Sequence, residues 1–323
     1  MMKRFKKGGK LISLIFGLFM IGLTTFAGAE TLFMESFENS DFLSRDWYDN
    51  TNHGTIVPGG KTGNCLQWAW TAGQTTPVNG GALRKKFAPT EALYVSIYVK
   101  FQPAWRGSQK PYHPHILLFP SNLDGDYCPL ANNYLNTYLE FISDMASPYA
   151  IRISAAIQDS LRVNVNYGSP PNNLTETTEN RSVAHCNGCK AGADCGMGIC
   201  YNGGGWYSAY AWRSSNYAVP RDQWVHIEAY FRMNTIRSNA GQADGVMQMW
   251  TDGMKVFDLR RVIYRTKQDE TKKWAQFVLA PYIGDGSPIS QTMWLDELTV
   301  GTESPYGSPT SISPPTGLRV LPP

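Results

Sequence analysis

The stretch that most constrains the fold runs from Trp224 to Gly253 and reads WVHIEAYFRMNTIRSNAGQADGVMQMWTDG. Between Val225 and Met233, apolar or small side chains alternate with polar or amphipathic ones, which is typical of a strand with one buried and one solvated face. A second strand, Gly245–Thr251, ends at Asp252-Gly253, a dipeptide that tolerates the positive φ angles of a tight hairpin turn. The stretch therefore predicts a β-meander whose return strand is Met254–Leu259.

The same alternation recurs elsewhere in the chain. It is clearest in Leu93–Phe101, Tyr149–Gln158 and Leu161–Tyr167, where apolar side chains alternate with polar ones. Many strands separated by turn residues, with no long helical period, predict an all-β fold, a β-sandwich or jelly roll. Weaker patterns predict further strands at Thr31–Phe37, Cys65–Trp70, Ile116–Phe119, Tyr138–Met145, Ala275–Ile283 and Met293–Val300.

Residues 1–29 predict a secretory signal peptide. A basic segment precedes the apolar run Leu11–Leu23, and Ala27-Gly28-Ala29 fits a small-residue cleavage site. The apolar run is shorter than the about 20 residues that span a bilayer, so a membrane anchor is the less favoured alternative. Without this segment the chain keeps 24 of its 29 Lys+Arg against 26 Asp+Glu, a formal charge of −2 instead of +3. The basic pI therefore argues for neither nucleic acid nor a membrane as a partner of the mature protein.

The rest of the chain divides into one domain and a tail. Residues 30–302 suit a single large β domain, and residues 303–323 form a linker rich in Pro and Ser. Pro314–Val320 resembles the opening strand of a fibronectin type III module. The 10 Trp and 17 Tyr can fill a core, and secreted β-proteins also use such rings to stack on sugars.

Six cysteines bear on the redox state of the protein. In an exported chain an even number favours disulfides, whose pairing cannot be read from the sequence. Zinc is the alternative for the group beginning at Cys186, but its spacing lacks the paired short intervals of such sites. The disulfide candidates are Cys65, Cys128, Cys186, Cys189, Cys195 and Cys200.

Several short motifs resemble those of a known fold family. They are Trp224-x-His226-Ile-Glu228, Asn234-Thr235, Ala243-Asp244-Gly245, Trp250-x-Asp252-Gly253 and Trp294-Leu-Asp296-Glu297-Leu-Thr-Val300. Over Leu93–Val300 the chain resembles the concanavalin A-like jelly-roll polysaccharide lyases that act on glucuronan and alginate. The acidic E-x-D-x-x-E motif of jelly-roll glycoside hydrolases is missing, because Glu140 and Asp144 do not fit its spacing. The resemblance implies a jelly-roll β-sandwich and a lyase that acts on an acidic polysaccharide.

Such a lyase needs three chemical functions. The uronate carboxylate must be neutralised, a base must take the C5 proton, and an acid must protonate the leaving oxygen. Arg or Lys suits the first function, and His or Tyr suits the other two. If the alternating strands share one concave sheet, their polar faces converge on one groove. The predicted catalytic residues are then Lys100, Arg152, His226 and Tyr230, and the predicted substrate-binding residues are Tyr98, His115, Arg162, Asn164, Asn166, Glu228 and Arg232.

Each of these assignments has a simpler alternative. A polar side chain on an outward strand face is ordinarily solvated or paired with its neighbour across the sheet. Asp244, Asp252 and Asp296 are interpreted as turn residues, with structural calcium as the alternative, and no other cofactor is expected. A non-catalytic, lectin-like module of the same fold is the alternative to the lyase.

Overall fold

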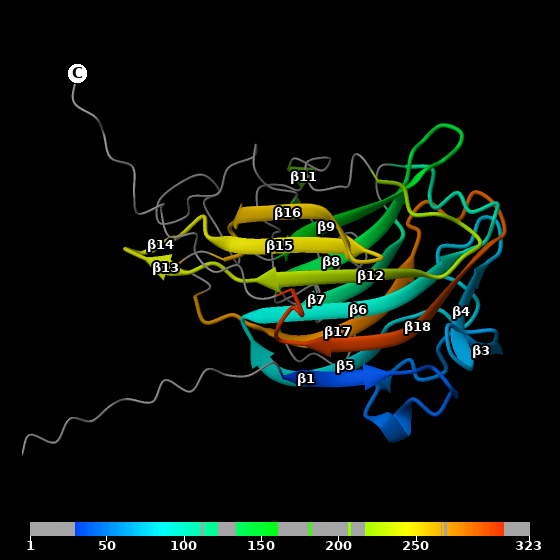
Figure 1. Ribbon diagram of the computed structural model, residues 1–323, viewed down its shortest axis with the longest axis horizontal. Coiled ribbons are helices and arrows are strands. Elements are labelled where there is room, and N and C mark those ends of the chain that lie inside the picture. The colour runs from blue at the N-terminus through cyan, green and yellow to red at the C-terminus, as the bar shows by residue number, and fades with distance from the viewer. Residues whose placement is uncertain are drawn as a thin grey trace, which may run out of the picture.

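The computed structural model describes residues 30–110, 113–121, 134–160, 181–182, 206–207, 217–265, 267 and 270–306. Two sheets pack face to face as a β-sandwich (Figure 1), which confirms the predicted all-β fold. The signal peptide, the Leu161–Tyr167 strand and most of the linker lie outside these residues. No helix in this part of the chain is long and apolar enough to cross a membrane.

The first sheet, called sheet A, contains the β-meander predicted from the sequence. Its strands in spatial order are β16 (Met254–Val262), β15 (Gly245–Thr251), β12 (Val225–Arg232), β6 (Ala92–Phe101), β18 (Gln291–Gly301), β4 (Asn64–Trp70) and β3 (Thr55–Pro58), and β1 (Thr31–Glu35) also pairs with β18.

The second sheet, called sheet B, lies behind sheet A in Figure 1. Its strands in spatial order are β11 (Trp206–Tyr207), β10 (Arg181–Ser182), β9 (Ile151–Ser160), β8 (Tyr134–Ser143), β7 (His115–Pro120), β17 (Trp274–Tyr282), β5 (Leu83–Thr90) and β2 (Tyr48–Asp49). The pairings are antiparallel except between β9 and β10. A small hairpin, β13 (Ile236–Arg237) with β14 (Ala240–Gly241), lies apart from both sheets.

The inner faces of the two sheets form the main core. Along β6, alternate side chains from Leu93 to Phe101 are at most 1% exposed. Aromatic rings from the two sheets contact each other between the layers. The ring centroids of Phe101 and Phe141 are 5.3 Å apart, and those of Phe119 and Phe231 are 5.8 Å apart. Each fully buried side chain of this size stabilises the fold by about 1.5–3 kcal/mol. The core therefore fixes which face of every strand points outward.

The predicted hairpin turn is confirmed in detail. Asp252 and Gly253 join β15 to β16 with φ angles of 47° and 76°. Strand β5 was missed, because its sequence LRKKFAPT contains adjacent charges and a proline. Arg84, in that strand, is nonetheless fully buried.

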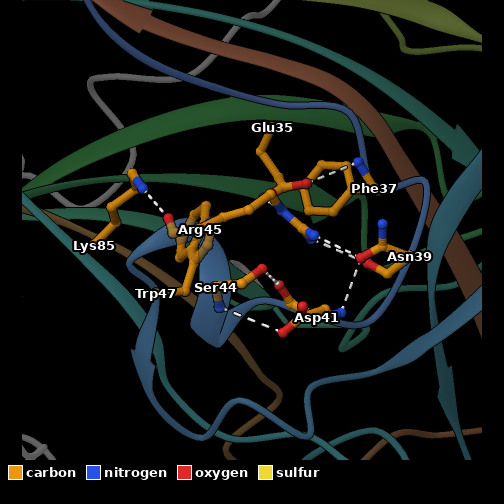
Figure 2. Close-up of polar contacts among 8 residues, drawn as sticks. All are labelled: Glu35, Phe37, Asn39, Asp41, Ser44, Arg45, Trp47 and Lys85. Carbon is orange, nitrogen blue, oxygen red and sulfur yellow. Dashed lines mark hydrogen bonds and ion pairs between the residues drawn. The ribbon is translucent and has the colours of Figure 1, made fainter.

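The N-terminal corner is held by one buried carboxylate (Figure 2). Glu35 is 3% exposed and accepts hydrogen bonds from the Phe37 amide at 2.9 Å, Arg45 Nε at 2.9 Å and the Trp47 indole at 2.8 Å. Arg45 also donates to the Asn39 side chain at 2.6 Å, which ties the loop before the 3₁₀ helix η1 (Leu43–Arg45) to β1. Because three donors satisfy the buried charge, this corner is a structural element.

Candidate functional site

The predicted catalytic residues lie on opposite sides of the sandwich. Lys100 on β6 and His226 and Tyr230 on β12 share the outer face of sheet A, and the two strands are neighbours as expected. Arg152 lies on β9, which belongs to sheet B. The prediction that all four face one groove is therefore wrong. Alternation in a sequence shows that a strand has an outward face, but not to which sheet the strand belongs.

His226 and Glu228 form a closed polar cluster on the outer face of sheet A. His226 Nδ1 lies 3.6 Å from Glu228 Oε2, and Nε2 lies 2.7 Å from the Ser96 hydroxyl. The hydroxyls of Tyr94 and Tyr306 donate to the two Glu228 oxygens, that of Tyr306 at 2.7 Å. The bond to Glu228 raises the pKa of Tyr306 to about 12, since losing the proton would place two anions side by side.

Two predicted residues on β12 are less available than expected. Tyr230 is 2% exposed and packs with Val246 and Trp250, so its predicted position on a solvated face is wrong. The physical reason is that large rings from neighbouring strands cover this part of the sheet. Arg232 is only partly exposed, and its guanidinium donates to the backbone oxygen of Asp244 at 3.2 Å.

Sheet B carries a pocket on its outer face, called the sheet B pocket. Its volume is about 520 Å³. Side chains of β7, β17 and the segments around β2 and β5 line it, and His115 is the lining residue that was predicted to bind substrate. The lining residues are Asp49, Asn50, Thr76, Gly81, Ala82, His115, Leu118, Ala280, Pro281 and Tyr282.

A buried carboxylate lies beside His115. Its Nδ1 lies 2.7 Å from Glu140 Oε1, and both side chains are less than one-tenth exposed. The register places these residues opposite each other on β7 and β8. Glu140 also accepts the backbone N–H of His113 at 3.3 Å. This contact lacks hydrogen-bond geometry, because His115 Nδ1 is buried with no hydrogen-bond partner among the described residues, so Glu140 acts on the ring through its nearby charge.

Three other rings surround His115. His113 lies edge-on to it at 4.4 Å, Tyr138 edge-on at 4.8 Å, and the Tyr282 ring is nearly parallel at 6.3 Å between centroids. His113 Nδ1 accepts the Gly284 N–H at 2.9 Å, and burial, followed by the nearby His115, lowers the pKa of His113 to about 2. His113 is therefore neutral at physiological pH and fixes its neighbour by packing.

The wall of the sheet B pocket contains one carboxylate, and its negative charge is offset by an arginine. Asp49 lines the pocket and accepts from Arg84 Nε at 2.7 Å. Arg84 Nη1 donates to Gln276 at 2.9 Å, while Nη2 is buried and has no hydrogen-bond partner among the described residues. The Arg84 charge offsets that of Asp49, so this pair adds no net charge to the pocket wall.

The remaining predicted residues do not join this site. Arg152 donates to Asp144 at 2.9 Å and to the backbone oxygen of Tyr217 at 3.1 Å, at the end of β9. Cys65 is a buried free thiol, so the prediction that it forms a disulfide is wrong; the residue lies on β4, beside the edge strand β3 of sheet A. Arg162, Asn164, Asn166, Cys128, Cys186, Cys189, Cys195 and Cys200 lie outside the described residues.

The described ranges contain no arrangement of side chains suited to metal ligation. There, no group of three or more His, Cys, Asp or Glu side chains is arranged to hold an ion. Asp244 and Asp252 accept hydrogen bonds from the backbone amides of Thr235 and His226, and Asp296 accepts from that of Lys61. The first two bonds agree with the interpretation of Asp244 and Asp252 as turn residues. Asp296 instead lies inside β18 and is fully buried, so its interpretation as a turn residue is wrong.

Comparisons with known proteins identify the fold. No protein-family model and no curated protein matches the sequence. A marine PL-14 alginate lyase from Aplysia kurodai matches with a TM-score of 0.51 at 12% identity, over 84% of this chain and 98% of that one. The alginate lyase vAL-1 from a Chlorella virus matches with a TM-score of 0.50 at 11% identity, over 84% and 99%. An endo-β-1,4-glucuronan lyase from Trichoderma reesei matches at 14% identity over 84% and 95%, with a TM-score of 0.43.

These similarities define the class of fold. The chain is a jelly-roll β-sandwich, as its motifs predicted, and solved structures that share this fold include alginate lyases. At this level of identity the likeness shows the fold alone. The fold hosts catalytic and binding proteins alike, so the function must be argued from the site.

Sequence reasoning missed the residues that make His115 a candidate. Glu140 was considered only as part of a hydrolase motif, and Tyr282 only as part of a strand. The sequence feature that pointed to this site is His113-Pro-His115 before an apolar run, because two histidines at the start of a strand often have a carboxylate partner on a neighbouring strand. The partner lies on the next strand, 25 residues away in sequence, and pairing between strands is not encoded locally.

Proposed function

We propose that the protein is an exported polysaccharide lyase that cleaves an acidic, uronate-containing glycan by β-elimination in the sheet B pocket. The observation that carries this proposal is His115, whose Nδ1 lies 2.7 Å from Glu140 at the wall of that pocket. A histidine beside a carboxylate is a common general base, because the carboxylate stabilises the imidazolium that forms. The jelly-roll fold, which alginate lyases share, agrees with this chemistry.

Two of the three chemical functions of a lyase, the base and the acid, fall to residues of this pocket. Nε2 of His115 takes the C5 proton of the uronate, and Glu140 stabilises the charge that appears on the ring. The electron pair released at C5 forms the C4–C5 double bond while the bond from C4 to the glycosidic oxygen breaks. The hydroxyl of Tyr282, which lines the same pocket, donates its proton to the departing oxygen. Proton exchange with solvent then restores both residues.

The test is cleavage of a panel of acidic polysaccharides, followed by the absorbance of the unsaturated uronate product. The parent protein is expected to cleave at least one of alginate and polyglucuronate, and His115→Gln is expected to remove the activity. His226→Gln is the matched control, because it changes the other His–Glu pair of the described residues. A parent that binds an acidic glycan without cleaving it would instead support the alternative, a lectin-like module.

Export is a separate part of this proposal. A signal peptide at residues 1–29 would place the mature N-terminus at Glu30. Mass spectrometry of secreted protein should find Glu30 or a near neighbour as the first residue. Intact Met1 on membrane-bound material would contradict this part and leave the chemistry of the pocket untouched.

A further inference from the structure

The outer face of sheet A presents two lysines that neutralise no carboxylate. Lys100 Nζ lies between two indole rings, 5.0 Å from the centroid of Trp224 and 4.8 Å from that of Trp294. Lys61 Nζ lies 4.9 Å from the centroid of Tyr98. Neither ammonium forms an ion pair within the described part of the chain. Each cation is instead held on aromatic faces, an arrangement that leaves its charge available to a ligand.

The strand register brings these groups to one surface. Trp294 lies opposite Lys100, and Tyr98 precedes Lys100 by two residues on the same face of β6, a separation of about 7 Å. Lys61 reaches this face because its backbone N–H donates to Asp296 at 2.6 Å. The five residues Lys61, Tyr98, Lys100, Trp224 and Trp294 are called the lysine–aromatic surface.

Nearby carboxylates form no ion pair with these lysines in the described part of the chain. Asp296 is fully buried and accepts the backbone N–H groups of Lys61, Thr62 and Glu297. Glu297 accepts the hydroxyl of Thr62. Both acids are thus engaged by the loop that carries Lys61, whereas that lysine is exposed and Lys100 is partly exposed.

We propose that the lysine–aromatic surface is a second, non-catalytic binding site for an acidic polysaccharide. Aromatic side chains offer apolar faces and edges to the C–H groups of sugar rings, and the two ammonium groups are placed to pair with uronate carboxylates. The indole rings restrict Lys100, so less side-chain entropy is lost when a carboxylate binds. The site lies on the opposite sheet from the sheet B pocket. One protein molecule would therefore bind one polysaccharide chain at this surface while it cleaves a second polysaccharide chain in the pocket.

A glycan fits this surface better than a nucleic acid does. Polyphosphate binders present extended basic patches that contact many phosphates. Here only two lysines define the charge, among aromatic rings, and the chain without residues 1–29 has a formal charge of −2. An acidic sugar polymer combines spaced carboxylates with apolar ring faces, which is the combination that these residues match.

The proposal is tested by calorimetric titration of a uronate tetrasaccharide into the His115→Gln protein, in which turnover is absent. We expect two binding equivalents in this background, one of which is lost or weakened by about 5- to 30-fold in K61M/K100M. Raised salt should weaken the same equivalent, because its charges are near solvent. K267M is the matched control: it removes the same charge from a lysine already paired with Glu270, and should keep both equivalents.

Three results would overturn the proposal. The first is unchanged glycan binding in K61M/K100M. The second is loss of binding in Lys100→Arg, a variant that keeps the charge, when its melting temperature equals that of its parent. The third is binding of single-stranded DNA by the same surface as tightly as the glycan. A variant that unfolds is replaced by Trp294→Phe, which keeps an aromatic ring and should weaken the site less than K61M/K100M. Because the readout is binding without turnover, failure of the proposed lyase activity leaves this test valid.

Discussion

Two histidine–glutamate pairs, one on each outer face of the sandwich, differ in what surrounds them. On sheet A, Glu228 accepts two tyrosine hydroxyls, and His226 contacts Ser96 through Nε2 and stacks on Tyr98 at 4.6 Å. On sheet B, Glu140 lies 2.7 Å from Nδ1 of a histidine that lines a pocket. In the first pair both ring nitrogens of the histidine lie against protein groups, whereas the histidine of the second pair lines a cavity.

The comparison shows that two pairs of the same residue types need not have the same function. Both pairs lie on the outer face of a sheet, and both glutamates are nearly fully buried. A base must reach the proton it takes, so access to a cavity matters as much as the identity of the side chain. His115 meets this requirement, and we therefore assign the chemistry to sheet B and a supporting role to the cluster on sheet A.

The largest expected effect comes from His115→Gln. Losing a general base typically lowers the rate by about 100- to 10,000-fold, and the loss should fall on kcat more than on KM because proton transfer occurs in the transition state. His226→Gln should retain most of the activity. Initial rates on the substrate that the parent cleaves provide the measurement. Equal losses of activity in His115→Gln and His226→Gln would contradict the assignment of the chemistry to the sheet B pair.

Gly284→Ala should disturb His115 in the sheet B pocket indirectly, through His113. A Cβ at this position would lie 2.5 Å from Cε1 of His113, so that ring must move and would no longer fix His115. Overpacking of this kind costs about 1–3 kcal/mol of stability, and we expect activity to fall further than stability alone explains. Urea unfolding and rate measurements on the same sample check this. Full activity in Gly284→Ala would show that His113 has no positioning role.

Glu228→Gln should act on stability. The substitution keeps the shape of the side chain but removes the charge that accepts the hydroxyls of Tyr94 and Tyr306, a loss of about 1–2 kcal/mol in the free energy of unfolding. Chemical denaturation provides the measurement, and Tyr306→Phe, which removes one of the two bonds from a half-exposed ring, is the smaller control step. A strong loss of activity with unchanged stability would contradict the structural assignment.

The smallest effect concerns alkaline pH. The pKa of Tyr306 is raised to about 12 by its bond to Glu228, so the folded protein holds this proton more tightly than the unfolded chain, whose tyrosine has a pKa near 10. The stabilisation is fully present below pH about 10 and is lost as the pH rises towards 12. The loss of stability should be slightly smaller in Tyr306→Phe. An identical alkaline profile would show that solvent screens the bond at this exposed ring.

The sequence predicted much of the fold and little of the candidate site. Alternation located β6, β12 and β15 within one or two residues, because burial on one face requires a period of two. It also placed His226 and Lys100 on an outward face correctly. It failed for Tyr230, since the side chains that cover it come from the neighbouring strands β15 and β6.

By itself, the sequence determined an all-β sandwich, the Asp252-Gly253 hairpin, and which face of its clearest strands is buried. These features follow from contacts between near neighbours and from the local geometry of strands and turns. Only the tertiary structure decided that β9 joins β7 and β8 rather than β6 and β12, and that Glu140 meets His115 beside a pocket. The physical reason is that the pairing of distant strands depends on packing of the whole core, which no short segment encodes.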